Sequence, residues 1–563
     1  MSFLHKGGTA YGDAGFSAFI RKAFSRHLGF DDHDFAKPVI GICNTFSEIN
    51  RCHSHFGPIV EAVKRGVLME GGIPLEFPTI SLGEIFTHPT TMLYRNLAAM
   101  DTEEMIRAQP MHGVVLMGGC DKTIPAQLMG AASADLPALV VSGGPMLNGE
   151  YEGRTLGACS DCRHFWQEFR AGTIDEEQLE EINAALAPSA GHCMVMGSAS
   201  TMAVLAEAMG MMLPGGAAYP APDNRRLRHA EESGRQIVRR VREGLRPSQI
   251  ITRHSLENGI RALMAVGGST NAVIHLVAIA GRLGIDLPLE LFDRIGRETP
   301  LLANLRPAGK YQMEEFARAG GVPVLLKELE PMLHLDCLTV TGKTVGENLA
   351  SVRRSPVYRE IIRPLSDPLH STGGIAVLKG SLAPRGAVIK PKAASPHLLK
   401  HRGRAVVFRS LEDLMARVDD PALEIGPEDV MVLQNAGPVG APGMPEAGLL
   451  PIPRKLLAQG VRDMVRISDA RMSGTASGTV ILHVVPEAAV GGPLGLVRDG
   501  DWIELDVEAR RLDLLVGEEE LERRRAVWQP PAPAYQRGYG WLFQRHVLQA
   551  DEGCDFDFLR GER

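Results

Sequence analysis

The turn that follows one short apolar run is the sequence feature that most constrains the fold. Residues 113–117 (GVVLM) predict a buried parallel strand, and the two glycines at 118–119 let the chain turn sharply at its carboxyl end. A cysteine, an aspartate and a lysine follow at 120–122, at the edge where open α/β sheets bind ligands. Because thiolates prefer iron–sulfur clusters, zinc or copper and carboxylates prefer magnesium, calcium or manganese, this turn suggests two metal centres at one site. On residue types alone, a buried structural cysteine beside a surface Asp–Lys pair is an equal alternative.

The same alternation of apolar strand, turn and helix recurs through the first half of the chain. Residues 38–42 (PVIGI) predict a strand that leads into a polar segment and then into a helix at 58–68. Residues 137–141 (PALVV) predict another strand, which ends in Ser-Gly-Gly. This alternation predicts an α/β domain in which a parallel sheet is flanked by helices.

The pattern changes after about residue 365, where helical periodicity becomes scarce. Short strands with glycine or proline turns are predicted at 373–390, 405–408, 429–433, 463–468, 479–485 and 502–515. Such a series predicts a β-rich, barrel-like or sandwich-like domain. Since 563 residues exceed what one core usually supports, we predict an α/β domain over residues 1–365 and a barrel-like domain over residues 366–563.

Composition excludes several classes of function. The net charge of −7, with scattered lysines and arginines, gives no basic patch for nucleic acid. No apolar run approaches the roughly 18 residues of a membrane span, and the first residues lack the features of a secretory signal. We therefore expect a cytoplasmic protein whose eight cysteines form no disulfide framework. Cys159 and Cys162 form a C-x-x-C pair, which is a weak signal for zinc or redox chemistry because no second pair accompanies it.

Two further segments place reactive residue types ahead of predicted helices. A cysteine lies in residues 191–202 (GHCMVMGSASTM), where the helix dipole favours thiolate, and the methionines there are interpreted as core packing. Residues 267–271 (GGSTN) form a candidate anion cradle at the start of another helix. His275, on the apolar helix that follows, is interpreted as a core histidine and not as a ligand.

Seven long motifs follow one another along the chain. They are SEINRCHSHF, GGCDKTIPA, GHCMVMGSASTM, GGSTNAVIHL, GGIAVLKGSLAPRGAVIK, GPVGAPGMPE and DARMSGTASGTVILHVVPEAAVGGPLGL. In this order they resemble the dihydroxy-acid dehydratase and sugar-acid dehydratase family over nearly the whole chain. RCHSHF stands where the branched-chain biosynthetic enzymes typically have Pro-Cys-Asn. With FPTISLGE and a tail ending in GCDFDFL, it makes the chain similar to the sugar-acid branch, the pentonate dehydratases.

The resemblance implies two metal groups. It implies a 2Fe–2S cluster held by Cys52, Cys120 and Cys193, with one iron left open to act as a Lewis acid. Cys43 and the C-x-x-C pair match no ligand position. The resemblance also implies Mg²⁺ held by oxygen ligands, with the lysine carried as an N-carboxylated (carbamate) side chain. These magnesium ligands are Glu84, Asp121, Lys122 and Glu446.

The resemblance further implies a catalytic base and a reaction. Ser473 matches the catalytic serine, activated by the nearby cation and by backbone amides, and Thr475 is expected to hydrogen-bond to it or to substrate. The implied activity is that of a hydro-lyase: removal of the C2 proton and the C3 hydroxyl of a 2,3-dihydroxy sugar acid gives the 2-keto-3-deoxy acid. Should another residue be the base, His53 or His55 beside Cys52 is the next candidate.

Three alternatives remain open at this point. The nearest is the dihydroxy-acid dehydratase of branched-chain amino-acid biosynthesis, which applies the same chemistry to an apolar substrate. The others are a non-catalytic iron–sulfur redox or sensor protein and a structural zinc protein. We also expect a homodimer or a homotetramer, and we expect the tail at 553–559 (GCDFDFL) to dock near a site or an interface.

Overall fold

Four parallel strands form the sheet of the N-terminal half in the computed structural model of the chain, which describes residues 4, 6 and 12–562. The strand order is β2-β1-β3-β4. The strands are β1 (Val39–Asn44), β2 (Ile73–Pro78), β3 (Gly113–Gly118) and β4 (Ala138–Ser142). All positions of β3 and β4 are buried, since helices cover both faces of the sheet. β3 is an interior strand, whereas β4 lies at the sheet edge, where the N–H of Val140 donates to the carbonyl oxygen of Met211. The parallel α/β prediction is therefore confirmed.

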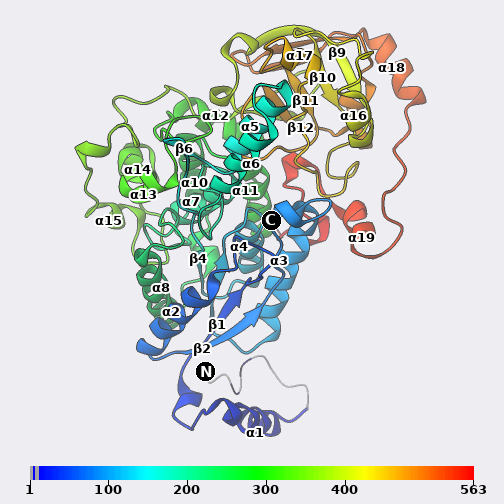
Figure 1. Ribbon diagram of the computed structural model, residues 1–563. Coiled ribbons are helices and arrows are strands. Elements are labelled where there is room, and N and C mark those ends of the chain that lie inside the picture. Colours follow the sequence, from blue (N-terminus) through cyan, green and yellow to red (C-terminus); the bar gives the residue numbers. More distant parts are fainter. Residues whose placement is uncertain (1–3, 5, 7–11, 563) are drawn as a thin grey trace.

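Helices cover both faces of this sheet (Figure 1). On one side α2 (Phe56–Met69) packs against α8 (Asn224–Glu243), and on the other α3 (Thr91–Ala108) packs against α4 (Thr123–Ala134). The α2–α8 contact is close enough to require glycine, because a Cβ on Gly66 would lie 1.9 Å from the carbonyl oxygen of Glu231. The first three of these helices in chain order each connect consecutive strands, so the carboxyl ends of the strands all face the same edge.

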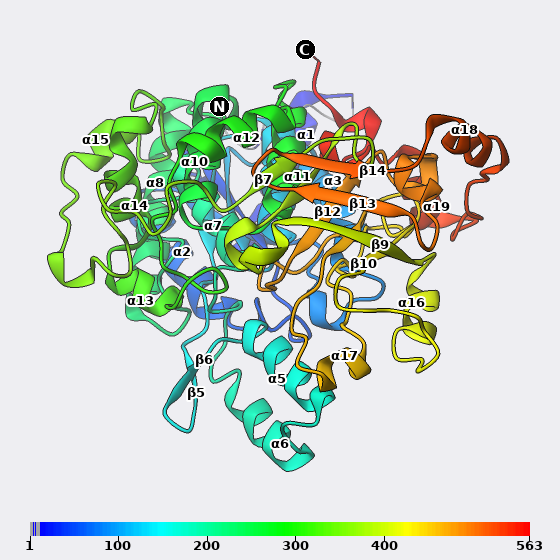
Figure 2. The same ribbon diagram turned by 90° about the horizontal axis from the view of Figure 1, so that it is seen from above.

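A layer of further helices extends the N-terminal half beyond the sheet (Figures 1 and 2). It comprises α7 (Ser198–Ala208), α9 (Pro247–Ile250), α10 (Arg253–Ala265), α11 (Asn271–Arg282), α12 (Leu289–Glu298), α13 (Met313–Arg318), α14 (Gly321–Leu329) and α15 (Val345–Leu349). The methionines around α7 are fully buried, which confirms their interpretation as core. The short helix α1 (Ala14–Ser25) lies near the chain's beginning.

The segment between β4 and α7 projects from the N-terminal half. It holds the hairpin of β5 (Gly149–Tyr151) and β6 (Arg154–Leu156), followed by α5 (Ser160–Ala171) and α6 (Glu176–Ala185). Figure 2 shows α5 and α6 projecting from the body on the side where α17 of the C-terminal half also lies. In α6 only Ile182 is buried, so this acidic helix is a solvated element, as its sequence predicts.

The C-terminal half is an eight-stranded mixed sheet with the order β14-β13-β9-β10-β11-β12-β8-β7. Its strands are β7 (Ala376–Leu378), β8 (Gly386–Ile389), β9 (Lys400–Phe408), β10 (Val430–Leu433), β11 (Arg466–Ser468), β12 (Val480–Val485), β13 (Trp502–Asp506) and β14 (Arg511–Leu514). A bridge between Lys379 and Arg511 joins the two edge strands, so the sheet closes on itself. The barrel-like prediction is confirmed, whereas the boundary near residue 365 stays a prediction.

Four helices accompany this barrel, more than the sequence predicted. They are α16 (Leu411–Arg417), α17 (Arg454–Ala458), α18 (Glu518–Val527) and α19 (Gly538–His546). No helix in the described part of the chain has both the length and the apolar character needed to cross a bilayer.

The C-terminal tail returns to the N-terminal half and is buried there. Arg95 of α3 donates to the carbonyl oxygens of Gly553 and Cys554, both at 2.8 Å. Arg282 of α11 pairs with Asp555 at 2.6 Å, with both side chains almost fully buried. The tail is therefore docked, on helices of its own chain, whereas its predicted position near a subunit interface stays a prediction.

Candidate active site

The residues singled out in the sequence gather around one pocket between the two halves. Its volume is about 290 Å³. Eight of the nine predicted site residues line it: Cys52, Glu84, Cys120, Asp121, Cys193, Glu446, Ser473 and Thr475. The ninth, Lys122, is buried and contacts three of the others. Each lining side chain comes from a segment that follows a strand or precedes a helix, which is why residues far apart in sequence meet here.

One side of the pocket, here called the thiol side, is formed by Cys52, Cys120, Cys193 and Cys159. Cys52 lies between β1 and α2, Cys120 follows β3, and Cys193 precedes α7. The nearby Cys52 thiol and burial together raise the pKa of the Cys120 thiol. A metal that binds Cys120 must therefore displace its proton.

The turn that carries Cys120 is fixed by a buried histidine. The Nε2 atom of His53 accepts hydrogen bonds from the backbone N–H groups of Gly119 and Cys120, at 3.0 and 2.9 Å. Gly119 is needed for close approach, since a Cβ there would lie 2.8 Å from the carbonyl oxygen of Cys52. Burial lowers the pKa of His53 to about 3, so the ring is neutral. With its Nε2 lone pair already used, His53 is not free to act as the base.

Cys159 is a pocket residue that the sequence patterns did not place here. It lies at the start of α5, lines the pocket, and its Sγ atom is 3.2 Å from that of Cys193. Its C-x-x-C partner, Cys162, is exposed and accepts a hydrogen bond from the backbone N–H of Cys159 at 3.2 Å. The C-x-x-C spacing was the available signal, and it did not reveal proximity to a cysteine 34 residues away.

The opposite side of the pocket, here called the carboxylate side, is formed by Glu84, Asp121 and Glu446 around two cations. Lys122 contacts Asp121 closely and lies 3.4 Å from Glu84 and 3.6 Å from Glu446. Burial alone lowers the pKa of Lys122, but the three carboxylates raise it, so the ammonium form is held. Burial opposes ionisation of Glu84 as well, yet Lys122 and Arg471 lower its pKa to about 2.

Arg471 connects the two halves of the molecule at this side. It is fully buried and donates to Glu446 at 3.2 Å and to the hydroxyl of Thr90 at 3.0 Å. Thr90 in turn donates to Glu84 at 2.7 Å. Asn271 of α11 also donates to Glu446, at 3.3 Å. Arg471 and Asn271 lie in two of the family motifs, but the sequence did not predict a role for either residue. Their contacts with Glu446 join segments that are distant in the chain.

Ser473 stands in a tight turn after β11. Its hydroxyl is 2.8 Å from that of Thr475, as the sequence-based expectation for Thr475 required. Gly474 between them packs so closely that a Cβ would lie 2.6 Å from the Ser269 side chain. The buried Lys390 donates to the carbonyl oxygen of Gly474 at 3.3 Å, and burial lowers its pKa to about 8. A cation therefore lies behind the turn that presents the serine.

The thiols and the carboxylates of the pocket fit the iron–sulfur cluster and the Mg²⁺ that the family resemblance implies to different degrees. The thiols are soft donors on one pocket wall, which fits an iron–sulfur group. The three carboxylates fit Mg²⁺, but the Lys122 ammonium among them does not, since it has no lone pair to offer. As these side chains stand, no group of three His, Cys, Asp or Glu in the described part of the chain is arranged to hold an ion. Binding therefore requires the carboxylates to close in and Lys122 to lose its charge, as carboxylation to a carbamate would do.

Other candidates from the sequence lie away from the pocket. Residues 269–271 of the candidate anion cradle are fully buried and pack against the Ser473 turn, so no anion reaches them. His275 is buried beside Arg95, 3.2 Å away, in keeping with its interpretation as a core histidine. Cys43 is buried against Thr79 and Gln127 and does not line the pocket.

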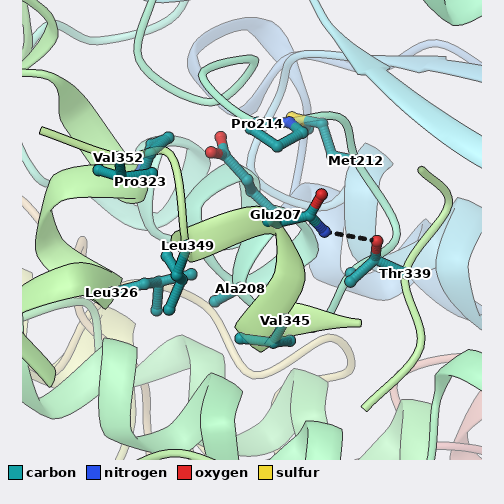
Figure 3. A pocket seen from close by; sticks show the side chains of 12 residues that line it. Glu207, Ala208, Met212, Pro214, Pro323, Leu326, Thr339, Val345, Leu349 and Val352 are labelled. Carbon is teal, nitrogen blue, oxygen red and sulfur yellow. Dashed lines mark hydrogen bonds between the residues drawn. The ribbon is translucent and has the colours of Figure 1, made fainter. Parts of the chain in front are cut away.

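A second cavity, between α7, α14 and α15, offers no comparable chemistry (Figure 3). It holds about 40 Å³, and Figure 3 shows mostly apolar side chains around a single carboxylate, Glu207. That carboxylate accepts hydrogen bonds from the backbone N–H groups of Gly215 and Ala217, at 2.6 and 2.9 Å. Glu207 thus serves the local backbone, and the cavity is too small for a sugar acid.

Comparisons with known proteins find relatives that match nearly the whole chain. The N-terminal domain of the Dihydroxy-acid/6-phosphogluconate dehydratases matches residues 37–348, and the C-terminal domain matches residues 360–554. The L-arabonate dehydratase of Azospirillum brasilense is 54% identical over 97% of this chain and 95% of its own length. The 6-deoxy-6-sulfo-D-gluconate dehydratase of Pseudomonas putida is 49% identical over 96% of this chain and 94% of its own. A dihydroxy-acid dehydratase of Ignicoccus hospitalis is 43% identical over 95% of this chain and 97% of its own.

Proposed function

Because the chain belongs to the dihydroxy-acid/6-phosphogluconate dehydratase family and is a hydro-lyase, we propose that it dehydrates an aldonate sugar acid to the 2-keto-3-deoxy acid. The observation that carries this proposal is the position of Ser473 in one pocket with a thiol side and a carboxylate side. The relatives named for arabonate and sulfogluconate support a sugar acid as the substrate class.

The iron–sulfur cluster and the Mg²⁺ ion would be bound on opposite sides of the pocket. Cys52, Cys120 and Cys193 would hold a 2Fe–2S cluster, and Glu84, Asp121, Glu446 and a carboxylated Lys122 would hold Mg²⁺. When bound, they would supply Lewis acidity for the enolate charge and for departure of the C3 hydroxyl.

The chain's own residues account for the proton transfer. Ser473, as the alkoxide, takes the proton from C2, and the Thr475 hydroxyl at 2.8 Å donates to it and holds its orientation. Lys390 behind the turn favours the alkoxide electrostatically. The buried Arg471 keeps Glu446 in place by a hydrogen bond of 3.2 Å. The resulting enol then tautomerises to the keto acid.

The branched-chain dihydroxy-acid dehydratase remains the second candidate, and one side chain of the pocket lining favours the sugar acid. Arg163 lines the pocket, and its Nε atom is buried without a hydrogen-bond partner. A hydroxyl group of a polyhydroxylated substrate would accept from this atom, whereas an apolar tail would leave it unsatisfied. A sensor or a zinc protein would have no use for Ser473 and the three carboxylates.

The test is a substrate screen on anaerobically purified protein. C4 to C6 aldonates are compared with 2,3-dihydroxyisovalerate, and 2-keto acid formation is followed. We expect kcat/KM to be highest for an aldonate. A higher kcat/KM for dihydroxyisovalerate than for every aldonate would replace the proposal by the second candidate.

We also propose that the protein assembles as a homodimer or a homotetramer. Apolar side chains beside the pocket support this, because Ile49, Ile85 and Phe86 are 75%, 72% and 71% exposed. Phe86→Ser should lower the mass measured by light scattering, whereas Met415→Ser, equally exposed on α16, should not. An unchanged mass for Phe86→Ser would remove this patch from the interface.

A further inference from the structure

The four thiols of the pocket form two pairs. The Cys52 thiol lies close enough to Cys120 to raise the pKa of that thiol, and the Sγ atom of Cys159 lies 3.2 Å from that of Cys193. A 2Fe–2S cluster has two irons, and each iron completes its coordination with two ligands from the protein, most often cysteines. Two pairs of thiols on one pocket wall therefore match the full requirement of such a cluster, whereas the three family positions leave one place unfilled.

We propose that Cys159 is the fourth thiol ligand of the cluster in the substrate-free enzyme, on the same iron as Cys193. This inference rests on the proposed function for the presence of the cluster. It adds a residue that lies outside the three ligand positions, and it concerns the state of the pocket before substrate arrives.

Cys159 is held at this place by a set of specific contacts. Asp161 accepts from the backbone N–H of Gly157 at 2.6 Å and pairs with Arg306 at 2.6 Å, which anchors the start of α5. The N–H of Ala158 contacts the sulfur of Met194 at 2.9 Å, next to Cys193. The segment before α5 is therefore fixed to the turn that carries Cys193, and the thiol contact is not the chance position of a surface loop.

The same segment is tied to the catalytic turn. The Ser160 hydroxyl donates to the backbone oxygen of Thr475 at 2.8 Å. Cys159 and Thr475 thus belong to one contiguous contact path, and a movement of the α5 start affects both. A sugar acid that occupies the pocket meets Cys159 and Thr475 together, since both line it.

The backbone of Cys159 shows how the thiol can give way. Its φ of 73° and ψ of −39° are rarely adopted by a residue with a Cβ, so the surrounding contacts impose this conformation. A cluster closed by four thiols has no room for a substrate oxygen, so Cys159 must leave when substrate enters. Relaxation of this strained backbone favours that departure. The thiol would then shield the iron from solvent in the empty enzyme and withdraw only for substrate.

The experiment compares Cys159→Ala with Cys162→Ala, its matched control three residues away, as reconstituted holoenzymes. Iron and sulfide are counted first, and Mössbauer spectra of ⁵⁷Fe are then recorded without substrate. In the wild type and in Cys162→Ala, we expect both irons to give the signal of sulfur-only coordination. In Cys159→Ala, one of the two irons should shift to the signal of mixed sulfur and oxygen coordination. Addition of the preferred aldonate to the wild type should produce the same shift.

Each outcome decides the matter. Superimposable spectra of Cys159→Ala and wild type, at equal iron content, would overturn the inference and leave the proposed function standing. Failure of Cys159→Ala alone to hold iron, with an unchanged circular dichroism spectrum, would support it by making the ligand indispensable. If the wild type itself assembles no 2Fe–2S cluster, the cluster part of the proposed function fails and the inference with it. A wild type with a full cluster but no dehydratase activity would leave the fourth ligand supported and refute the activity.

Discussion

The two sides of the pocket differ in how the charge of their metal-binding side chains is balanced when no metal is present. The carboxylate side keeps its charges and brings its own cations, because Lys122 and Arg471 lie among Glu84, Asp121 and Glu446. On the thiol side, the nearby Cys52 thiol and burial instead raise the pKa of Cys120. The carboxylates have cationic partners without a metal, whereas the proton of Cys120 must be displaced by any metal that binds there.

Because of this difference, we expect the iron–sulfur cluster and the Mg²⁺ ion to be removed and restored independently of each other. The carboxylate side can lack its metal without leaving the carboxylates unpaired, since the Lys122 ammonium pairs with all three of them. The thiol side has no such internal substitute in the contacts described above, so its order depends on the group it binds. The following predictions break or sharpen this comparison, from the largest effect to the smallest.

Substitution of the serine that faces both sides should have the largest effect. Ser473→Ala should lower kcat by about 10³-fold, within the range for loss of a general base, while iron and magnesium contents stay unchanged. Exchange of the C2 proton with solvent deuterium, followed by NMR, should stop as well. Ser477→Ala, at an exposed position of the same loop, is the control and should be active. Normal exchange in Ser473→Ala would assign the base to another residue.

Removing one donor from each side should separate the two groups. Asp121→Asn should reduce turnover by 10²-fold or more, since loss of a metal ligand removes several kcal/mol of transition-state stabilisation. The visible absorbance of the iron–sulfur group should persist in that variant. Cys193→Ser should instead abolish the absorbance and leave Mg²⁺ binding, measured calorimetrically, intact. Near-normal turnover of Asp121→Asn would contradict a role for the carboxylate side in catalysis.

The stability of the metal-free protein should reveal the charges of the carboxylate side. The pKa of Glu84 is about 2 in the folded state against an ordinary value of 4.5. A depressed pKa stabilises the fold fully above pH 4.5, and this contribution is lost as pH falls from 4.5 towards 2. The shift corresponds to about 3 kcal/mol. Urea midpoints of wild type and Glu84→Gln, measured from pH 7 to pH 3, should therefore converge at low pH. Parallel curves would show that Glu84 is not held ionised by Lys122 and Arg471.

The cation behind the serine should have a smaller effect. Lys390→Met should lower kcat by about 10-fold, equal to about 1.4 kcal/mol of lost stabilisation of the alkoxide. Because burial lowers the pKa of Lys390 to about 8, its charge is present below pH 8 and is lost above it. The decline of wild-type kcat above pH 8 should be absent from the variant. Lys392→Met, two residues away and only partly buried, is the control. An identical pH profile in Lys390→Met would exclude this role.

Local sequence patterns were sufficient for most of the fold and for the reactive turns. The apolar runs that became β1, β3 and β4 were recognised because parallel strands buried on both faces are continuously apolar. β2 (Ile73–Pro78) was missed because Pro74, Pro78 and a glutamate interrupt its apolar pattern, which only an edge strand tolerates. α18 and α19 were missed because they carry little helical periodicity of their own.

The contacts that complete the site were beyond sequence reasoning for a physical reason. Cys159 meets Cys193, and Arg471 meets Thr90, only because distant segments pack together. Lys390 reaches Gly474 across 84 residues of chain. Neither periodicity nor residue spacing predicts contacts between segments so far apart in the chain. The order of the motifs, by contrast, was enough to predict which turns carry the metal-binding side chains.

The docking of the C-terminal tail joins segments that lie 458 residues apart in the chain, since Arg95 of α3 donates to the carbonyl oxygen of Gly553. Arg95 and Arg282 are both buried, and each would lose a partner without the tail. A buried guanidinium that loses its partners costs free energy of folding. The packing of the α/β half therefore depends on residues that follow the barrel in the chain, which couples the folding of the two halves into one cooperative transition.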